Sequence, residues 1–175
     1  MKSVTFVLPG DGRSGGVRVT AIMANLLMSR GYQVRIILPD RRKSIRRRLL
    51  SLVNQFSVRD KRNAGFLHVF RGPVERYTDI NRLSFQEGEV VIAVGTYSVA
   101  DVRKLSRVPL RVRFNHGFPA KPSESDVLAW KGRMPTITVS STLVPKLQAE
   151  TEGSVWGVVP NGIDRKDYFV DPTIK

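Results

Sequence analysis

Seven short apolar runs, separated by segments with helical periodicity, constrain the fold of this chain more than any other feature. The runs span residues 4–8, 34–38, 67–70, 90–94, 110–114, 136–139 and 155–159. Runs this short, rich in Val, Ile, Leu and Phe, are typical of strands that are buried on both faces of a parallel sheet. We therefore expect seven strands.

The segment after the first run has the periodicity of an amphipathic helix. Its apolar side chains are spaced by three and one residues, at Val19, Ile22, Met23, Leu26 and Leu27. Gly31 follows as a C-terminal stop. Further helices are expected at 97–105, after Ser123 with Asp126 as its capping-box partner, and at 142–150 behind Ser141.

This alternation of strands and helices predicts an α/β protein. We expect a Rossmann-like, doubly wound, mainly parallel sheet of about seven strands with helices on both faces. Ligands bind such sheets beyond the carboxyl ends of the strands, so the loops PGDGRSGG, GTYS, NHGF and PNGID are the candidates for a site. Residues 71–85 are weakly patterned and predict an irregular connection.

The loop after the first run contains the spacing G-x-G-x-x-G over residues 10–15. Glycines at a strand-to-helix turn let backbone N–H groups approach a phosphate. A dinucleotide site would also want an acidic residue near the end of the second strand, and Asp40 is close to the expected distance. The helical periodicity, however, begins only after Gly16, and Asp40 lies beyond a proline. A dinucleotide site is therefore disfavoured, and a tight turn without a ligand stays open.

The composition limits the partners and the chemistry. The 29 Lys and Arg exceed the 15 Asp and Glu by a net charge of +14, which favours a polyanionic partner. The absence of cysteine excludes disulfides and thiolate metal sites and is typical of a reducing compartment. Only His68 and His116 carry imidazoles, and we expect no metal site. No segment has the length of a signal-peptide core or a membrane span, so we expect a cytoplasmic protein, soluble or peripheral.

The segment VWGVVPNGIDRKDYF contains Pro-Asn-Gly-Ile-Asp at 160–164, followed by Phe169. It resembles the hinge motif of the group 1 (family-four) glycosyltransferases of GT-B fold. Other elements agree in order along nearly the whole chain: Gly15-Gly16 with Arg18, RGYQV at 30–34, NHGF at 115–118 and TVSS at 138–141. Gln33 where the family often has His, the extra Asp11-Gly12 and the basic stretch 41–62 depart from the family pattern.

The resemblance implies that residues 1–164 form the Rossmann-like, acceptor-side domain of a retaining glycosyltransferase. Residues 165–175 would begin the linker to a C-terminal donor domain, which we expect outside this sequence. The substrates would be a nucleotide-sugar donor and a glycan or lipid-linked acceptor, with no cofactor. Without the second domain, which supplies most nucleotide contacts in this family, we expect the chain to transfer no sugar and to bind donor weakly.

The resemblance also implies roles for particular residues. His116 would contact the donor sugar near the reacting centre, although a lone histidine in a turn is often structural. Gly15 and Gly16 would face the donor diphosphate, and Arg18 would contact a phosphate or an anionic acceptor. Thr96 and Tyr97 would belong to the acceptor loop, and Asn161 and Gly162 would form the hinge. Ordinary turns and solvated loop residues remain the alternative for each of them.

The stretch RRKSIRRRLLSLVNQFSVRDKR has the pattern of a basic amphipathic helix. Its apolar stripe is Ile45, Leu49, Leu52 and Phe56. We expect it to dock on an anionic membrane at the inner face, with Arg42, Arg46, Leu49 and Phe56 in contact. The alternative is a crossover helix that packs on the sheet. A basic Rossmann-like module that binds nucleic acid or a dinucleotide without transferase activity is the second function to test, although no nucleic-acid signature accompanies the charge.

Overall fold

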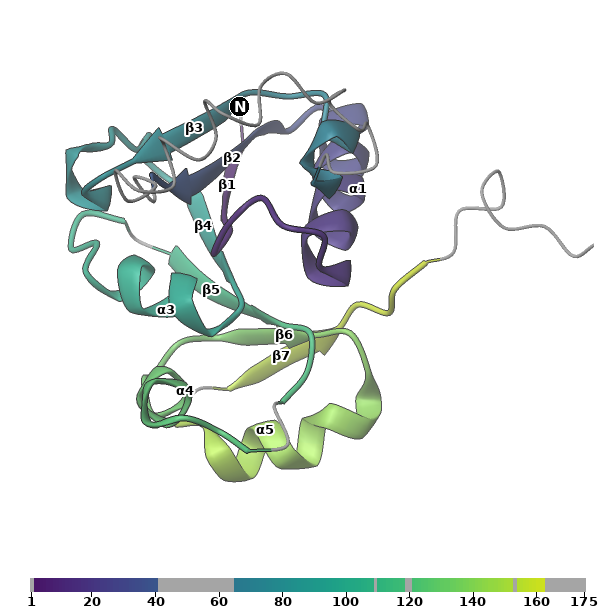
Figure 1. Cartoon of the computed structure of the whole chain (residues 1–175), viewed down its shortest axis with the longest axis vertical. Coiled ribbons are helices and arrows are strands. Elements are labelled where there is room, and N and C mark those ends of the chain that lie inside the picture. Colours follow the sequence, from purple (N-terminus) through teal and green to yellow (C-terminus); the bar gives the residue numbers. More distant parts are fainter. Residues whose placement is uncertain (1, 41–64, 109, 119–120, 153, 163–175) are drawn as a thin grey trace, which may run out of the picture.

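A seven-stranded sheet forms the centre of the molecule (Figure 1). The computed structural model describes residues 2–40, 65–108, 110–118, 121–152 and 154–162. The strands are β1 (Ser3–Val7), β2 (Gln33–Pro39), β3 (Val74–Tyr77), β4 (Val90–Val94), β5 (Leu110–Asn115), β6 (Thr136–Thr138) and β7 (Val155–Val158). All six strand pairings among the described residues are parallel. The α/β fold class expected from the alternation is therefore confirmed.

The strand order β3-β2-β1-β4-β5-β6-β7 reverses direction beside β1. The chain runs outward from β1 through β2 to β3 and then returns to place β4 on the other side of β1. Val4 of β1 is therefore paired with Val34 of β2 on one side and with Val90 of β4 on the other. At such a reversal the connecting loops diverge to opposite faces and leave a crevice at the carboxyl ends of the strands. This edge is where the site is expected.

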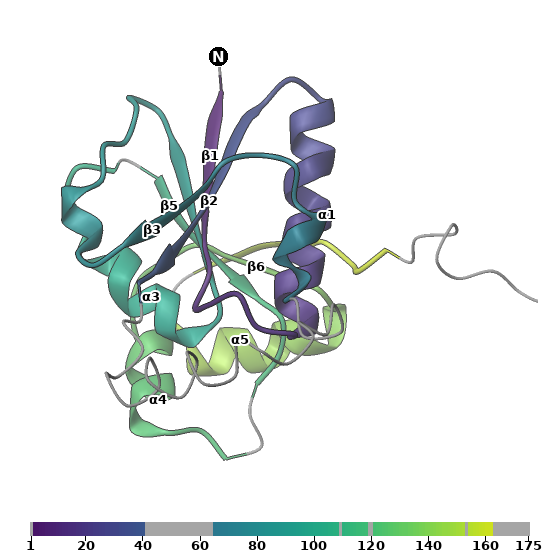
Figure 2. The same ribbon diagram turned by 45° about the horizontal axis from the view of Figure 1, so that its top comes forward.

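Helices cover both faces of the sheet, as expected for a doubly wound fold (Figures 1 and 2). On one face α1 (Gly15–Ser29) buries Val17, Ala21 and Ala24 in a cluster with Phe6 of β1. On the other face α3 (Thr96–Arg103) packs Val99 and Val102 in a second cluster that contains Val7. The remaining helical segments are α4 (Glu124–Trp130), α5 (Val144–Glu150) and the short 3-10 turns η3 (Phe66–Val69), η4 (Ile80–Arg82) and η5 (Ser141–Leu143).

Local sequence signals explain where the helices begin and end. The Ser14 side chain accepts a hydrogen bond from the Val17 backbone N–H and caps α1, and Gly31 after its C-terminus has φ +84°, which favours glycine. Ser123 and Asp126 form the expected capping box at the start of α4. Gly95, with φ +79°, makes the sharp turn from β4 into α3.

The third strand was expected in the wrong place. Residues 67–70 do not form a strand: Phe66–Val69 is the turn η3, which packs against α1. The strand β3 lies instead at Val74–Tyr77, inside the segment expected to be irregular. It carries no apolar run because it is the edge strand of the sheet, where Val74 is exposed and only Tyr77 is buried.

Two helix starts also differ from expectation. The helix α1 begins at Gly15, so both glycines belong to its first turn, while its buried face begins at Val17, as the periodicity predicted. The last helix is preceded by the turn η5, capped by the Ser140 side chain, and α5 proper spans Val144–Glu150. Asp40, in contrast, lies just beyond β2 as expected, and its N–H donates to the Tyr77 carbonyl.

Some expectations lie outside the described residues. These are the basic helix over 41–62 with its proposed contacts Arg42, Arg46, Leu49 and Phe56, the domain end at 164 and the linker 165–175. In the described parts of the chain, none of the helices has both the length and the apolar character needed to cross a membrane.

Candidate functional site

The start of α1 meets the end of β5 at the carboxyl edge of the sheet. Gly16, in the first turn of α1, faces His116, which directly follows β5. A Cβ atom at Gly16 would lie 3.7 Å from His116 Cδ2 and 3.8 Å from Cγ. Two candidate residues separated by 100 positions in the sequence are thus adjacent across the sheet. Gly15 precedes them at the helix N-terminus, and a Cβ atom there would meet no atom within 4 Å.

His116 is held largely out of solvent without a partner for one of its nitrogens. Its ring packs on Phe114 with centroids 4.2 Å apart, and its Nε2 atom is buried with no hydrogen-bond partner among the described residues. Burial lowers the pKa of His116 from 6.5 to about 4. With this pKa the imidazole is neutral at physiological pH and is a weak acceptor for a proton.

The turn around His116 is fixed by its neighbours. The Asn115 side-chain oxygen accepts a hydrogen bond from the Gly117 backbone N–H at 2.9 Å, which bends the chain away from β5. This bend positions His116 beside a cavity of about 100 Å³ that is also lined by Gly95 and Thr96. Thr96 therefore belongs to the same region as His116.

Tyr97 lies on the other side of the α3 N-terminus. Its side chain is 63% exposed and lines a hollow of about 230 Å³ with Pro9, which follows β1, and Pro39, the last residue of β2. The wall of this hollow is fixed by the Tyr77 hydroxyl, which donates to Asp101 at 2.8 Å. The two residues expected in an acceptor loop thus open onto two neighbouring hollows at the carboxyl edge.

Arg18 and the extra residues of the first loop contact the η3 and β3 side of this edge. The Arg18 guanidinium lies 5.8 Å from the centre of the Phe66 ring. Asp11 forms an ion pair with Arg76 of β3 at 2.6 Å, and the backbone of Gly65 packs directly against the Asp11 carbonyl. Asp11 therefore ties the glycine loop to the edge strand.

Asn161 and Gly162 line a different hollow. With Val159 and Pro160 they face the apolar residues of α1, including Leu26, around a volume of about 580 Å³. The expected hinge residues thus lie against α1, in a hollow other than the one that His116 and Thr96 line.

Comparison with models of known protein families, with curated proteins and with solved structures found no match. The site is therefore interpreted from its geometry and from the sequence motifs alone. Across the described part of the chain, His, Asp and Glu side chains do not gather in threes that could hold a metal ion.

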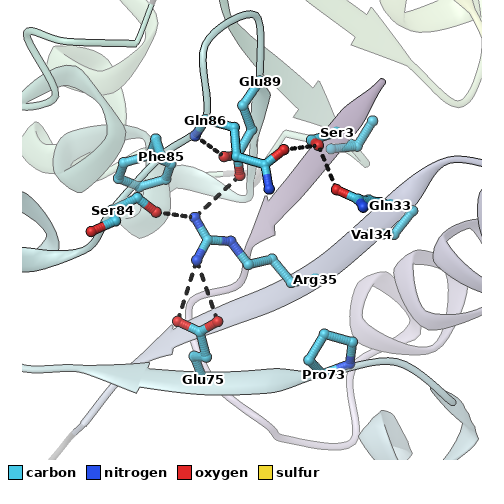
Figure 3. A pocket seen from close by; sticks show the side chains of 11 residues that line it. Ser3, Gln33, Val34, Arg35, Pro73, Glu75, Ser84, Phe85, Gln86 and Glu89 are labelled. Atoms are coloured by element: carbon cyan, nitrogen blue, oxygen red, sulfur yellow. Dashed lines mark hydrogen bonds and ion pairs between the residues drawn. The ribbon is translucent and has the colours of Figure 1, made fainter. Parts of the chain in front are cut away.

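A polar network occupies the opposite, amino-terminal edge of the sheet (Figure 3). Arg35 of β2 donates to the carboxylates of Glu75 and Glu89 and to the Ser84 carbonyl. Glu89 is 3% exposed and also accepts from the Gln86 N–H and the Thr5 hydroxyl. Because these groups satisfy one another and lie at the edge opposite to the loops, we interpret the network as structural.

Sequence reasoning missed Arg113, which lies in β5 next to the site. Its guanidinium is 2% exposed, and its Nη2 atom donates to the carbonyls of Ala129, Trp130 and Gly132 near the end of α4. Its Nε and Nη1 atoms have no partner. The available signal was an arginine between Val112 and Phe114 in a strand of the sheet, because a charge buried there must be compensated in the fold.

Proposed function

We propose that this chain is the N-terminal, acceptor-side domain of a retaining GT-B glycosyltransferase that uses a nucleotide-sugar donor. The observation that carries the proposal is the pairing of Gly16 with His116 across the carboxyl edge of the sheet. These are the two elements, a glycine turn and a histidine after the fifth strand, that the motif resemblance assigns to the donor diphosphate and the donor sugar.

The chemistry of sugar transfer fits this arrangement. The acceptor hydroxyl attacks the anomeric carbon as the bond from that carbon to the diphosphate oxygen breaks, and the hydroxyl proton passes to the departing phosphate. Backbone N–H groups at the N-terminus of α1, near Gly15 and Gly16, would stabilise the charge that builds on the diphosphate. The products are a glycoside and a nucleoside diphosphate, and no protein base is needed.

The electrostatics of His116 suit a hydrogen-bonding role. A neutral imidazole with an unpartnered Nε2 can bond a sugar hydroxyl without taking its proton. In this proposal His116 orients the donor sugar, and the departing phosphate serves as the base. The neighbouring Thr96 and Tyr97 would face the acceptor.

The chain contains two histidines, so their ring signals in NMR spectra test the proposal directly. UDP-glucose and GDP-mannose are titrated separately, and NAD is titrated as the dinucleotide alternative. We expect a nucleotide sugar to shift the His116 ring signals saturably and weakly, while the exposed His68 serves as the internal control. The proposal fails if neither nucleotide sugar moves His116, or if NAD binds there more tightly than both.

The net charge of +14 supports a second proposal, that the protein acts at the inner face of an anionic membrane in the cytoplasm. The segment 41–62 carries the basic and apolar residues that such docking would use. Sedimentation with anionic vesicles but not with neutral ones is the expected result, and Arg42→Glu with Arg46→Glu should weaken it. Tight binding to duplex DNA at physiological salt would instead favour the nucleic-acid module.

A further inference from the structure

A buried arginine and a helix N-terminus converge on one small cavity. The cavity of about 100 Å³ lies where β5, α3 and α4 meet, and Arg113, Gly95, Thr96 and Trp130 are among its lining residues. Ligand pockets for whole small molecules begin at roughly 300 Å³. The cavity therefore has room for a single small functional group. The side chains and backbone groups that line the cavity indicate the charge of that group.

Arg113 supplies an uncompensated positive charge. No described acidic residue forms an ion pair with it, and its three hydrogen bonds are all made by Nη2 to backbone carbonyls. Its Nε and Nη1 atoms are buried without a partner, although a buried guanidinium N–H normally has one. Burial and, second, the nearby charge of Arg103 lower its pKa to about 10.

The N-terminus of α3 adds a second source of positive potential to the same cavity. Its N-cap residue is Gly95, and no side chain caps the helix there. The first N–H groups of a helix have no partner within the helix, and the helix dipole favours an anion at this end. The pKa of Asp126 is lowered by hydrogen bonds from Ser123 and also by Thr96, so Asp126 accounts for the Thr96 hydroxyl, and the backbone and Arg113 define the site.

We propose that this cavity binds a compact oxyanion, a phosphate or carboxylate group, between the Arg113 guanidinium and the N-terminus of α3. A planar guanidinium with two free N–H directions matches two oxygens of such a group. The assignment of this oxyanion to the acceptor substrate rests on the proposed function, because Thr96 lies in the expected acceptor loop. The anion site itself does not depend on sugar transfer.

The test is a titration of the whole chain with inorganic phosphate at constant ionic strength, followed by NMR. The signals of the Arg113 Nε–H and of the Gly95 and Thr96 amides report on the cavity. A parallel titration with acetate separates a phosphate site from a carboxylate site. We expect saturable shifts of these three signals with at least one of the two anions.

Asn115→Asp is the matched variant. Asn115 lines the cavity, and an aspartate keeps the oxygen that accepts from the Gly117 N–H while adding a negative charge. We expect it to weaken anion binding at least about tenfold. Gln33→Glu makes the same chemical change at the opposite edge of the sheet and should leave binding unchanged.

Two results would overturn the proposal. One is the absence of any saturable shift at Arg113 Nε–H, with phosphate perturbing exposed arginines only. The other is an Asn115→Asp variant that binds phosphate as the unaltered chain does. His116 also lines this cavity, so its ring signals are followed in both titrations. A phosphate response at Arg113 without a nucleotide-sugar response at His116 would leave the anion site and remove the proposed function, and the reverse result would do the opposite.

Discussion

The environment of His116 links a single residue to both stability and function. Its ring packs on Phe114 and faces the backbone of Gly16, with Nε2 buried and unpartnered. A buried polar group without a hydrogen-bond partner costs stability. Two predictions follow from these contacts at the scale of the residue.

The first prediction concerns pH. Because the pKa of His116 is about 4 in the folded chain and 6.5 as its ordinary value, the unfolded state binds more protons between these pH values. The free energy of unfolding should therefore fall as pH is lowered from 6.5 to 4, by up to about 3 kcal/mol from this residue. Urea unfolding at several pH values measures this decrease in the free energy of unfolding.

The control for this prediction is His116→Gln, which cannot titrate. The variant should lose that part of the pH dependence, while contributions from carboxylates persist in both proteins. The same decline in stability between pH 6.5 and 4 in both proteins would show that His116 titrates normally and is not buried as described.

The second prediction separates stability from binding at Gly16. A methyl group there would lie at ordinary contact distance from His116, so Gly16→Ala should fold and gain up to about 1 kcal/mol from its helix propensity. The methyl group would also occupy the space above the His116 ring and should abolish the response of His116 to nucleotide sugars. Thermal unfolding and the NMR titration measure the two effects.

Gly15→Ala provides the comparison, because a Cβ atom there would meet nothing within 4 Å. It should leave the His116 ring signals of the free protein unchanged, whereas Gly16→Ala should shift them. A Gly16→Ala variant that responds to nucleotide sugars as the unaltered chain does would remove the glycine turn from the proposed site.

At the scale of elements, the Arg35 network fastens the amino-terminal ends of the central strands. Arg35 of β2 reaches Glu75 of β3 and Glu89 just before β4, and it lies 5.1 Å from the centre of the Phe85 ring. The connection between β3 and β4, which the sequence pattern leaves irregular, is thereby tied to the sheet. The two carboxylates differ in burial, and this difference gives a prediction.

Glu89→Gln should destabilise the chain by about 3 kcal/mol, because it removes the charge of a carboxylate that is 3% exposed and paired with Arg35. Glu75→Gln is the matched control on the same arginine. Its carboxylate is 42% exposed, so its loss should cost under about 1 kcal/mol. Chemical denaturation measures both, and equal costs would mean that burial does not set the strength of this network.

Which elements could be predicted from the sequence depends on their burial. The strands β1 and β4 lie in the middle of the sheet and are nearly wholly buried, so their apolar runs identify them. The edge strand β3 is half polar, so its sequence did not predict a strand. The turn η3 has an apolar run because it packs on α1, and this run was predicted to be a strand. An apolar run indicates that a segment is buried, but it does not by itself indicate whether the backbone is a strand or a helix.

The candidate site divides in the same way. Loops at the carboxyl edge could be expected to meet there because parallel strands all end on one side, and Gly16 and His116 are adjacent. The position of Arg113 in a strand was visible in the sequence, but its two nitrogens without a partner among the described residues follow from the packing of α4 against β5. Which hydrogen bonds a single side chain makes depends on the tertiary structure.

For the whole molecule, the doubly wound sheet accounts for the position of the site, and the site accounts for the proposed chemistry. The reversal of strand order beside β1 opens the edge at which the glycine turn, His116 and the N-terminus of α3 converge. We propose that this carboxyl edge of the sheet faces a second domain, because the motif at 160–164 resembles the hinge between two Rossmann-like domains.

The most direct measurement is the nucleotide sequence of the parent gene beyond the codon for Lys175. Our account predicts that the next stretch of domain length encodes a second Rossmann-like domain carrying the paired-glutamate motif Glu-x7-Glu. A stop codon there, or an unrelated domain, would contradict the account and favour a basic binding module.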